Sequence, residues 1–334
     1  MLPAPAAAAR QVLLLVLDGL GWELLEAHRG ALPRLDGLSG GAIDAVVPST
    51  TAAALPTLTT GLPPSVHGML GFRFRVGGEI LNALRWRIDG RGKAPDPAEV
   101  QPHPPFAAQP VPVVSQAQFR DTGFTAAHLR GADLHGWHTP AGLLTASRAL
   151  LAAGHRLIYA YYDGVDKVAH AHGLASPHLR DELAATDRLV GDLLDVLPAG
   201  GCLLVTADHG QVQVGAEGQR SLAELDPFID RYSGEGRFRS LHARAGAAAA
   251  LAEAARERFG HLAWVRTRSQ LVEEGWLGPG LGAVTAGRLG DVVLAPHGPW
   301  AFADPGYPGE QRLESMHGAP TPAEVRVPLL AGRS

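Results

Sequence analysis

The stretch Cys202-Leu203-Leu204-Val205-Thr206-Ala207-Asp208-His209-Gly210 decides the fold. A continuous apolar run of this kind is typical of a central parallel strand that is covered on both faces. A carboxylate and an imidazole, Asp208 and His209, follow where this strand should end, and both groups bind divalent metal ions. The stretch therefore predicts a buried strand with a metal site at its carboxyl end.

Two other stretches have the same form. The apolar run 12–17 precedes Asp18, and the run 157–162 precedes Asp166 and His170. Each aspartate taken alone is more simply explained as a helix N-cap or a turn residue. In open α/β sheets, however, ligands gather beyond the carboxyl ends of the strands, so three such ends favour one shared metal site.

The spacing around Asp166 indicates which nearby residues are predicted to be ligands and which are not. Asp166 and His170 are four residues apart, so on a helix their side chains share one face and can hold one cation. His172 is offset from that face and is predicted to be an outer partner of the ligands or a surface residue. Asp163 is predicted to be a turn residue with a reserve role as ligand.

Helical stretches at about 138–153 and 177–197 lie between the apolar runs, and this alternation predicts βαβ units with a parallel sheet. We expect a catalytic core formed by residues 1–225 and 301–334, with a smaller α+β cap at 226–300. Residues 88–112 are rich in Pro, Gly and charge, and predict a long loop over the core that roofs the site.

Composition excludes several classes of protein. The chain has 334 residues, of which 46% are hydrophobic and 19% charged, as in ordinary globular proteins. A net charge of −4 without a Lys/Arg cluster predicts no nucleic-acid-binding patch. Cys202 excludes an intrachain disulfide because it is the only cysteine, and the apolar run 12–17 is too short for a signal peptide or a membrane span. We therefore expect a cytoplasmic protein with no membrane segment.

A hydroxyl-rich segment provides a candidate nucleophile. In Pro48-Ser49-Thr50-Thr51-Ala52, three hydroxyls precede a run of small residues that ends at Gly61. A hydroxyl at a helix N-terminus can be a plain N-cap, or it can meet a phosphoryl oxygen beside the helix dipole. Contact with a metal ion would make its alkoxide accessible near neutral pH. His317, in a polar loop, is equally consistent with a solvated residue and with a ligand.

The order of these motifs resembles the alkaline phosphatase superfamily, and specifically its type I phosphodiesterase/nucleotide pyrophosphatase family. The motifs run Asp, hydroxyl, Asp-x-x-x-His, Asp-His-Gly and His-Gly between residues 12 and 330. The resemblance implies a three-layer α/β/α sandwich with a mostly parallel sheet. It also implies two divalent metal ions, usually zinc, on either side of a Thr or Ser nucleophile; manganese and iron accept the same donors.

The resemblance also assigns residues to the two metal ions. One ion would be held by Asp166, His170 and His317, and the other by Asp18, Asp208, His209 and Thr51. Thr51 would be the nucleophile because it lies ten positions before Gly61 of the Thr-Gly pair. Ser49 or Thr50 is the alternative. His67, in a Pro-x-x-His-Gly turn, would be structural rather than a ligand.

Two positions depart from the nucleotide-cleaving members of the family. An aromatic that stacks a base and an asparagine that binds a phosphoryl oxygen are replaced by Ala52 and Ala54. We therefore expect the chain to keep the reaction type of the family, whereas these two positions argue against its specificity for nucleotides. Asn82 is a candidate for a replacement substrate-binding amide, although a lone Asn is more often a turn residue.

These inferences predict a metal-dependent phosphoester hydrolase acting on a small-molecule substrate. The favoured reaction is that of a phosphodiesterase or pyrophosphatase, through a phosphothreonine intermediate. A phosphomonoesterase or a phosphonate hydrolase of the same superfamily is the alternative. An alternative of another class is a catalytically silent, metal-stabilised binding protein that kept the scaffold.

Overall fold

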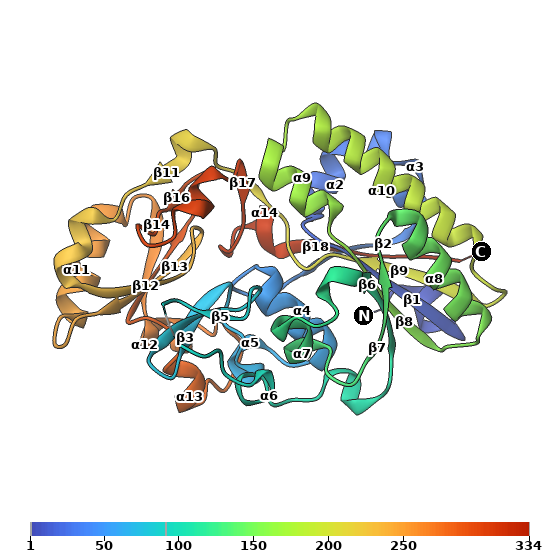
Figure 1. The fold of residues 1–334 in the computed structure, drawn as a ribbon. Helices are drawn as coiled ribbons and strands as arrows, with labels where there is room; N and C mark the ends of the chain where they lie inside the picture. Colours follow the sequence, from blue (N-terminus) through green and yellow to red (C-terminus); the bar gives the residue numbers. More distant parts are fainter. Residues whose placement is uncertain (1, 91, 334) are drawn as a thin grey trace.

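A seven-stranded sheet forms the centre of the computed structural model, which describes residues 2–90 and 92–333. The strand order is β2-β18-β9-β1-β8-β6-β7 (Figure 1). Within the sheet only β18 runs against its neighbours β2 and β9, so the predicted mostly parallel sheet is confirmed. The strands are β1 Gln11–Leu17, β2 Ser39–Asp44, β6 Pro112–Gln116, β7 Asp133–Trp137, β8 Leu157–Tyr162, β9 Gly201–Thr206 and β18 Arg326–Arg333.

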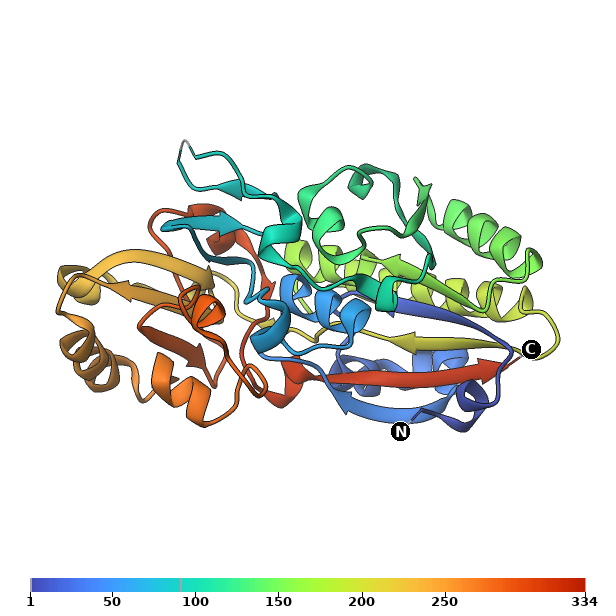
Figure 2. The ribbon, with the colours of Figure 1, turned by 90° about the horizontal axis from the view of Figure 1, so that it is seen from below.

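Helices cover both faces of this sheet and complete the three-layer sandwich (Figures 1 and 2). The helices on one face are α2 Trp22–His28, α3 Pro33–Asp36, α8 Pro140–Ala152, α9 Gly164–His172 and α10 Pro177–Asp195. The helices on the other face are α4 Thr51–Thr60, α5 Pro64–His67 and α7 Gly123–His128. Within the described ranges, no helix has both the length and the apolar character needed to cross a bilayer.

Alternation along β1 explains why both faces must be covered. Leu15 and Leu17 pack in the core that includes Leu183 of α10, whereas Val16 packs on the opposite side with Leu55 of α4. Successive side chains of a strand point to opposite faces, so an entirely apolar strand buries area in two layers. The continuous apolar runs are therefore the physical cause of the sandwich.

Each of the two helices predicted from the sequence begins at a proline that follows an N-cap residue. The Thr139 hydroxyl accepts a hydrogen bond from Gly142 N at 3.4 Å, and the Ser176 hydroxyl accepts one from Leu179 N at 3.1 Å. Each cap precedes a proline at the first helical position, where its missing N–H costs no helical hydrogen bond. The observed bounds of α8 and α10 agree with the predicted ones to within two residues.

A second, smaller sheet lies inside the predicted cap, residues 226–300; the boundaries of the cap and core remain a prediction. It has the order β12-β13-β15-β14 and is covered by α11 (Figure 1). Its elements are β12 Ile229–Glu235, β13 Phe238–Ala243, α11 Ala248–Phe259, β14 Ala263–Thr267, α12 Arg268–Glu273, α13 Ala283–Ala286 and β15 Val292–Pro296.

A three-stranded hairpin sheet follows α5 and was not predicted. Its strands are β3 Arg73–Val76, β4 Glu79–Asn82 and β5 Arg87–Ile88. An ion pair of 2.6 Å between Arg231 of β12 and Glu79 of β4 connects it to the smaller sheet. The remaining short α-helices and strands are α1 Ala4–Ala7, α6 Pro97–Val100, β10 Val212–Gln213, β11 Gln219–Arg220, β16 Ala301–Phe302, β17 Ser315–Met316 and α14 Pro322–Val325.

Candidate two-metal active site

Three adjacent strands bring the predicted aspartates together. β1 lies between β8 and β9, in a register that pairs Leu17 with Tyr162 and Val16 with Thr206. Asp18, Asp166 and Asp208 follow the ends of these strands, so all three leave the sheet at one edge. The central position of β1 is the reason that residues almost two hundred positions apart share one site.

His317 reaches the same edge through long-range pairing. β17, which ends one residue before His317, pairs antiparallel with β10, matching Met316 with Val212. β10 itself begins three residues after His209. β18 then enters the sheet antiparallel to β9, so the segment before it must lie at the carboxyl ends of the parallel strands. The structure therefore places His317 in the site rather than in a solvated loop.

The donor atoms form two overlapping groups. Atoms of Asp18, Asp208 and His209 lie within 4.8 Å of one another, and so do atoms of Asp166, His209 and His317. His170 joins the second group, because its Nε2 lies 3.2 Å from Oδ1 of Asp166. The six predicted Asp and His ligands thus meet in one place. By distance alone His209 lies between the groups, whereas the resemblance assigns it to the Asp18 group.

Two buried carboxylate oxygens show that the site fits a cation. Oδ1 of Asp18 and Oδ2 of Asp208 are buried and have no hydrogen-bond partner among the described residues. They lie 3.4 Å and 3.5 Å from Nε2 of His209. Buried charged oxygens without partners are strongly destabilising unless a cation compensates them. Together with the imidazoles, they form a donor set suited to zinc and acceptable to manganese or iron.

Backbone carbonyl groups orient the three histidines so that they can bind a metal ion. Nδ1 of His170 lies 2.7 Å from the Ser315 carbonyl oxygen, and Nδ1 of His317 lies 2.8 Å from the Ser49 carbonyl oxygen. Nδ1 of His209 lies 3.1 Å from the carbonyl oxygen of the next residue. A carbonyl oxygen only accepts, so each Nδ1 carries a proton, which leaves Nε2 as the ring atom that can bind a metal ion. Such carbonyl partners fix the orientation of metal-binding imidazoles.

The crowded ligand side chains shift one another's pKa values. Burial raises the pKa of Asp18 well above its usual value, and the charges of Asp208 and Asp166 raise it further. Burial also acts to raise the pKa of Asp166, but the neighbouring imidazoles, first that of His170, outweigh it and lower this pKa. Burial, with His209 and His170, lowers the pKa of His317. His317 is therefore neutral, which is the form that coordinates metal.

Three residues around the ligands were missed by the sequence analysis. The Tyr161 hydroxyl donates to Oδ2 of Asp18, and Nε2 of Gln211 donates to Oδ1 of Asp166 at 2.8 Å. Gly19 has φ of +74°, and a Cβ there would lie 2.5 Å from Nε2 of Gln211. Only glycine therefore permits this approach. Gly19 follows Asp18 directly and Gln211 stands two residues after His209, so nearness to a predicted ligand was the available signal for both.

The three candidate hydroxyls differ in their surroundings. The Ser49 hydroxyl donates to the Ala319 carbonyl at 2.8 Å and accepts from Gly318 N at 3.2 Å, so it holds the loop after His317 in place. Oγ1 of Thr51, the first residue of α4, lies 3.1 Å from Nε2 of His209. Thr50 is the N-cap of α4. This geometry favours Thr51 as the nucleophile over both alternatives.

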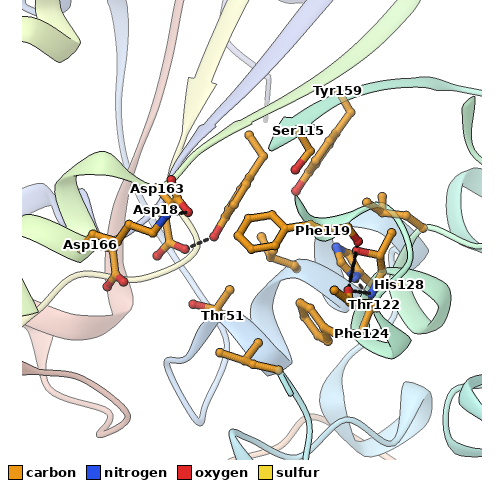
Figure 3. Close-up of a pocket in the computed structure, with 16 residues that line it drawn as sticks. Asp18, Thr51, Ser115, Phe119, Thr122, Phe124, His128, Tyr159, Asp163 and Asp166 are labelled. Carbon is orange, nitrogen blue, oxygen red and sulfur yellow. Dashed lines mark hydrogen bonds and ion pairs between the residues drawn. The ribbon is translucent and has the colours of Figure 1, made fainter. Parts of the chain in front are cut away.

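Two cavities meet at Thr51. The first, of about 210 Å³, contains Thr51 and Asp18; aromatic and aliphatic side chains line it together with polar ones such as Thr125 and Lys167. Figure 3 shows Thr51 between the acidic side chains on one side and Phe119, Phe124 and Tyr159 on the other. The second cavity, of about 330 Å³, contains Thr51 with His170 and His317; its remaining wall includes Phe72, Arg85, Glu235, Tyr307 and Glu310. Asp166 and Leu84 line both cavities.

Neither the described part of the segment predicted to roof the site nor the predicted substrate amide lines the two cavities. Apart from Arg91, which lies outside the described residues, segment 88–112 contains short helical turns and supplies no lining residue to either cavity. Leu84 lines both cavities instead, and Phe119 lines the first one. Asn82 also lines neither cavity; its Oδ1 accepts a hydrogen bond from Arg85 N at 3.0 Å. The amide therefore fixes a turn, and its Oδ1 is committed to the backbone.

The other polar residues near the motifs lie outside both metal groups. His172 is exposed and stacks on His178, with ring centroids 3.9 Å apart. Asp163 is buried and paired with Lys167 at 2.7 Å, one turn along α9. His67 accepts from Met69 N through Nδ1 at 3.1 Å, and its Nε2 lies 2.9 Å from the Thr57 hydroxyl. The three side chains are accounted for by structural contacts.

We expect His67→Ala to lower the free energy of unfolding by about 2–4 kcal/mol while leaving metal content unchanged. His67 is fully buried, and burial lowers its pKa to about 3, so the lost contacts are those of a neutral ring that ties α5 to α4. Urea denaturation at pH 7 measures the loss. His138→Ala, at an exposed position, is the control and should change stability by less than about 0.5 kcal/mol. Loss of metal from His67→Ala alone would instead make His67 part of the site.

Glu235 gives the metal-free protein a pH-dependent stability. Burial raises its pKa to about 8, and its Oε2 accepts from Phe72 N at 2.8 Å. A carboxyl group whose pKa is higher in the folded state contributes stability that is complete below its unfolded value and is lost as pH rises through about 8.

We therefore expect the wild-type protein to lose more unfolding free energy than Glu235→Gln between pH 5 and pH 8, by on the order of a few kcal/mol. The amide is neutral throughout this range and can keep the contact with Phe72. Denaturant unfolding in EDTA at four pH values measures the difference. Parallel stability curves for the two proteins would contradict it.

Comparison with known proteins places the chain in a family. The family described as type I phosphodiesterase/nucleotide pyrophosphatase matches residues 12–148 and 136–320. Among curated proteins, the chain is similar to GPI ethanolamine phosphate transferase 3 of Schizosaccharomyces pombe, with 36% identity over 77 residues. It is also similar to GPI ethanolamine phosphate transferase 3, catalytic subunit, of Mus musculus, with 29% identity over 85 residues. The matched segments cover 23% and 25% of this chain, and only 8% of each relative.

Solved structures are similar over nearly the whole chain. Murine ectonucleotide pyrophosphatase/phosphodiesterase 5 superposes with a TM-score of 0.75 and 16% identity, covering 97% of this chain and 88% of that one. An inactive variant of the murine protein in complex with AMP gives a TM-score of 0.74, and the human protein gives 0.73, with the same identity and coverage. These structures share the fold, and the family match extends over most of the sequence. The chain belongs to the type I phosphodiesterase/nucleotide pyrophosphatase family, within the alkaline phosphatase superfamily.

Proposed function

We propose that the protein is a phosphoester hydrolase that cleaves phosphodiesters or pyrophosphates at a two-metal site, with Thr51 as nucleophile. One observation carries the proposal: Oγ1 of Thr51 lies against the donor group whose buried carboxylate oxygens, on Asp18 and Asp208, have no other partner among the described residues. Asp18, Asp208, His209 and Thr51 would hold one divalent ion, and Asp166, His170 and His317 the other. Zinc is the proposed metal, with manganese or iron as alternatives.

When bound, the metal ions would supply Lewis acidity, neutralising phosphoryl oxygens and lowering the pKa of coordinated hydroxyl groups. Thr51 would attack phosphorus in line, so that its Oγ1–P bond forms as the P–O bond to the departing group breaks. Water would then cleave the Oγ1–P bond and regenerate the threonine hydroxyl. Thr51 is the first residue of α4, so backbone N–H groups at this helix N-terminus would be available to phosphoryl oxygens.

The two cavities favour a diester over a monoester. A phosphodiester carries two substituents, and cavities of about 210 Å³ and 330 Å³ adjoin Thr51. The first is largely apolar and suits an aromatic or aliphatic substituent. A monoester, or a phosphonate with a small group on phosphorus, would leave one of the two without an occupant.

The decisive test is metal-dependent release of nitrophenol from bis(4-nitrophenyl) phosphate and from 4-nitrophenyl phosphate. The proposal expects turnover that EDTA abolishes and zinc or manganese restores, with higher kcat/KM on the diester. A preference for the monoester would favour a phosphomonoesterase. Activity on neither ester, with metal bound, would instead indicate a metal-stabilised binding protein.

The physiological substituents are a separate part of the proposal. A murine structural neighbour binds AMP as an inactive variant. In this chain Ala52 and Ala54 supply neither a stacking ring nor an amide, so we propose a substrate range wider than nucleotides. A cytoplasmic location also remains a proposal, which fractionation of the source cells would test.

A further inference from the structure

The turn between β4 and β5 carries two residues that reach the site. Leu84 lines both cavities beside Thr51, and Arg85 lines the second one, with Thr51, His170 and His317. Both side chains are exposed at this turn. The turn therefore presents one apolar and one cationic side chain toward a substrate held at Thr51.

The turn is fixed on both sides of Arg85. Oδ1 of Asn82 accepts from Arg85 N at 3.0 Å, and the Ala83 N–H donates to the Phe72 carbonyl at 2.8 Å. Trp86 is buried, and its Nε1 donates to the Pro95 carbonyl at 2.9 Å. The backbone that carries Arg85 is thus anchored before and after the residue, which lowers the entropy lost when the side chain binds a ligand.

The guanidinium of Arg85 is free to bind an anion. Its central carbon lies 6.0 Å from the ring centroid of Tyr307, and no hydrogen bond or ion pair engages the group in residues 2–90 and 92–333. Arg73, nearby, is instead paired with Asp304 and Asp89. Arg85 is therefore the guanidinium on this cavity wall that has donors to offer.

The acidic side chains of the same cavity do not cancel this charge. Glu310 is paired with Arg239, which occupies its Oε1, and Asp166 is paired with His170 at 3.2 Å. Burial raises the pKa of Glu235 to about 8, so this carboxyl is largely neutral at pH 7. The second cavity thus combines a free cation with few competing anions.

We propose that Arg85 determines specificity by binding a second negative charge on the substituent that occupies the second cavity. The inference rests on the proposed function, because it takes the scissile phosphorus to lie at Thr51. The proposed contact follows from the shape of arginine, because a planar guanidinium matches the paired oxygens of phosphate or carboxylate. Arg85 is thus a positioning residue for charged substituents, and uncharged substituents gain little from it.

The test compares two nitrophenyl esters that differ in charge. Bis(4-nitrophenyl) phosphate carries one negative charge, and P1,P2-bis(4-nitrophenyl) pyrophosphate carries two. Arg85→Ala should lower kcat/KM about 10-fold or more on the pyrophosphate and less than about 3-fold on the phosphate. Arg85→Lys should recover part of the difference, because it keeps the charge but loses the planar fork.

Arg87→Ala is the matched control. Arg87 lies two residues away on β5, is exposed and lines neither cavity, so its loss removes the same net charge from the same hairpin. It should leave the ratio of the two kcat/KM values unchanged. Equal losses on both esters with Arg85→Ala, or the same change in ratio with Arg87→Ala, would overturn the proposal. So would a larger loss on 4-nitrophenyl phosphate, since Arg85 would then contact the scissile phosphoryl group itself.

A binding measurement separates this inference from the proposed function. Calorimetry would follow a non-hydrolysable methylene-bridged analogue of the pyrophosphate diester, with Thr51→Ala and with Thr51→Ala/Arg85→Ala, both loaded with zinc. A roughly 10-fold weaker affinity in the double variant supports the role of Arg85 even if no ester is hydrolysed. Unchanged affinity overturns it even if hydrolysis is observed.

Discussion

Replacement of Thr51 by alanine is expected to abolish turnover, lowering kcat by roughly 10,000-fold or more, while metal content stays nearly unchanged. The reason is that Thr51 provides the attacking oxygen, whereas the Asp and His side chains provide most of the metal ligands. Stopped assays on bis(4-nitrophenyl) phosphate, with elemental analysis of the same dialysed samples, measure both quantities. Alanine fits the helix at this position, because the next three residues of α4 are already alanines.

Two further variants make this result specific. Thr51→Ser keeps a hydroxyl at the start of α4 and should retain activity within about 10- to 100-fold of the wild type. Thr50→Ala removes the neighbouring hydroxyl, which lies in the second cavity but is not the one beside His209. Turnover that survives Thr51→Ala and disappears with Thr50→Ala would move the nucleophile by one residue.

Asp208→Asn is expected to have opposite effects on stability with and without metal. In the metal-free protein, the charge of Asp208 raises the pKa of the buried Asp18, so its removal relieves repulsion and should increase the unfolding free energy by about 1–3 kcal/mol. With metal, the variant loses a charged ligand, so it should retain less zinc after dialysis and gain less stability from added zinc. Thermal unfolding in EDTA measures the expected gain in stability, and thermal unfolding in zinc measures the smaller stabilisation by the metal.

Asp187→Asn is the control for this prediction. Asp187 is also buried, but its carboxylate accepts hydrogen bonds from Arg34 N and Leu35 N at the start of α3, far along the chain from any proposed ligand. Its replacement should lower the melting temperature equally in EDTA and in zinc, and should leave zinc content unchanged. If Asp208→Asn behaved in the same way, its carboxylate would be structural and the metal assignment would fail.

The core could be predicted because its signals are local. The runs that became β1, β8 and β9 are apolar throughout, and a strand of that kind has to be buried on both faces. The helices α8 and α10 begin at N-caps followed by proline, which are visible in the sequence. The ligands that follow these strands could be predicted for the same reason, because a parallel sheet collects the ends of its strands at one edge.

The hairpin β3–β5 and the walls of the cavities could not be predicted in this way. The strands of the hairpin are short, between two and four residues, and carry no sustained alternation. Neither the half-buried Phe119 nor the exposed Arg85 has a local sequence feature that marks it as a cavity residue. Segment 88–112, by contrast, has the composition of a loop, but composition does not state over which part of the core a loop lies.

The sequence by itself determined the parallel core, the aspartates at its strand ends and the order of motifs that identifies the family. These features follow from hydrophobic period and from spacing along the chain, which are local properties. Only the tertiary structure decided that Asn82 serves a turn and that Arg85 lines the second cavity, and it brings His317, which local sequence alone left undecided, to the other ligands. Each of these depends on pairing between segments far apart in sequence, such as β10 with β17, and on which polar atoms remain without a partner once the chain has folded.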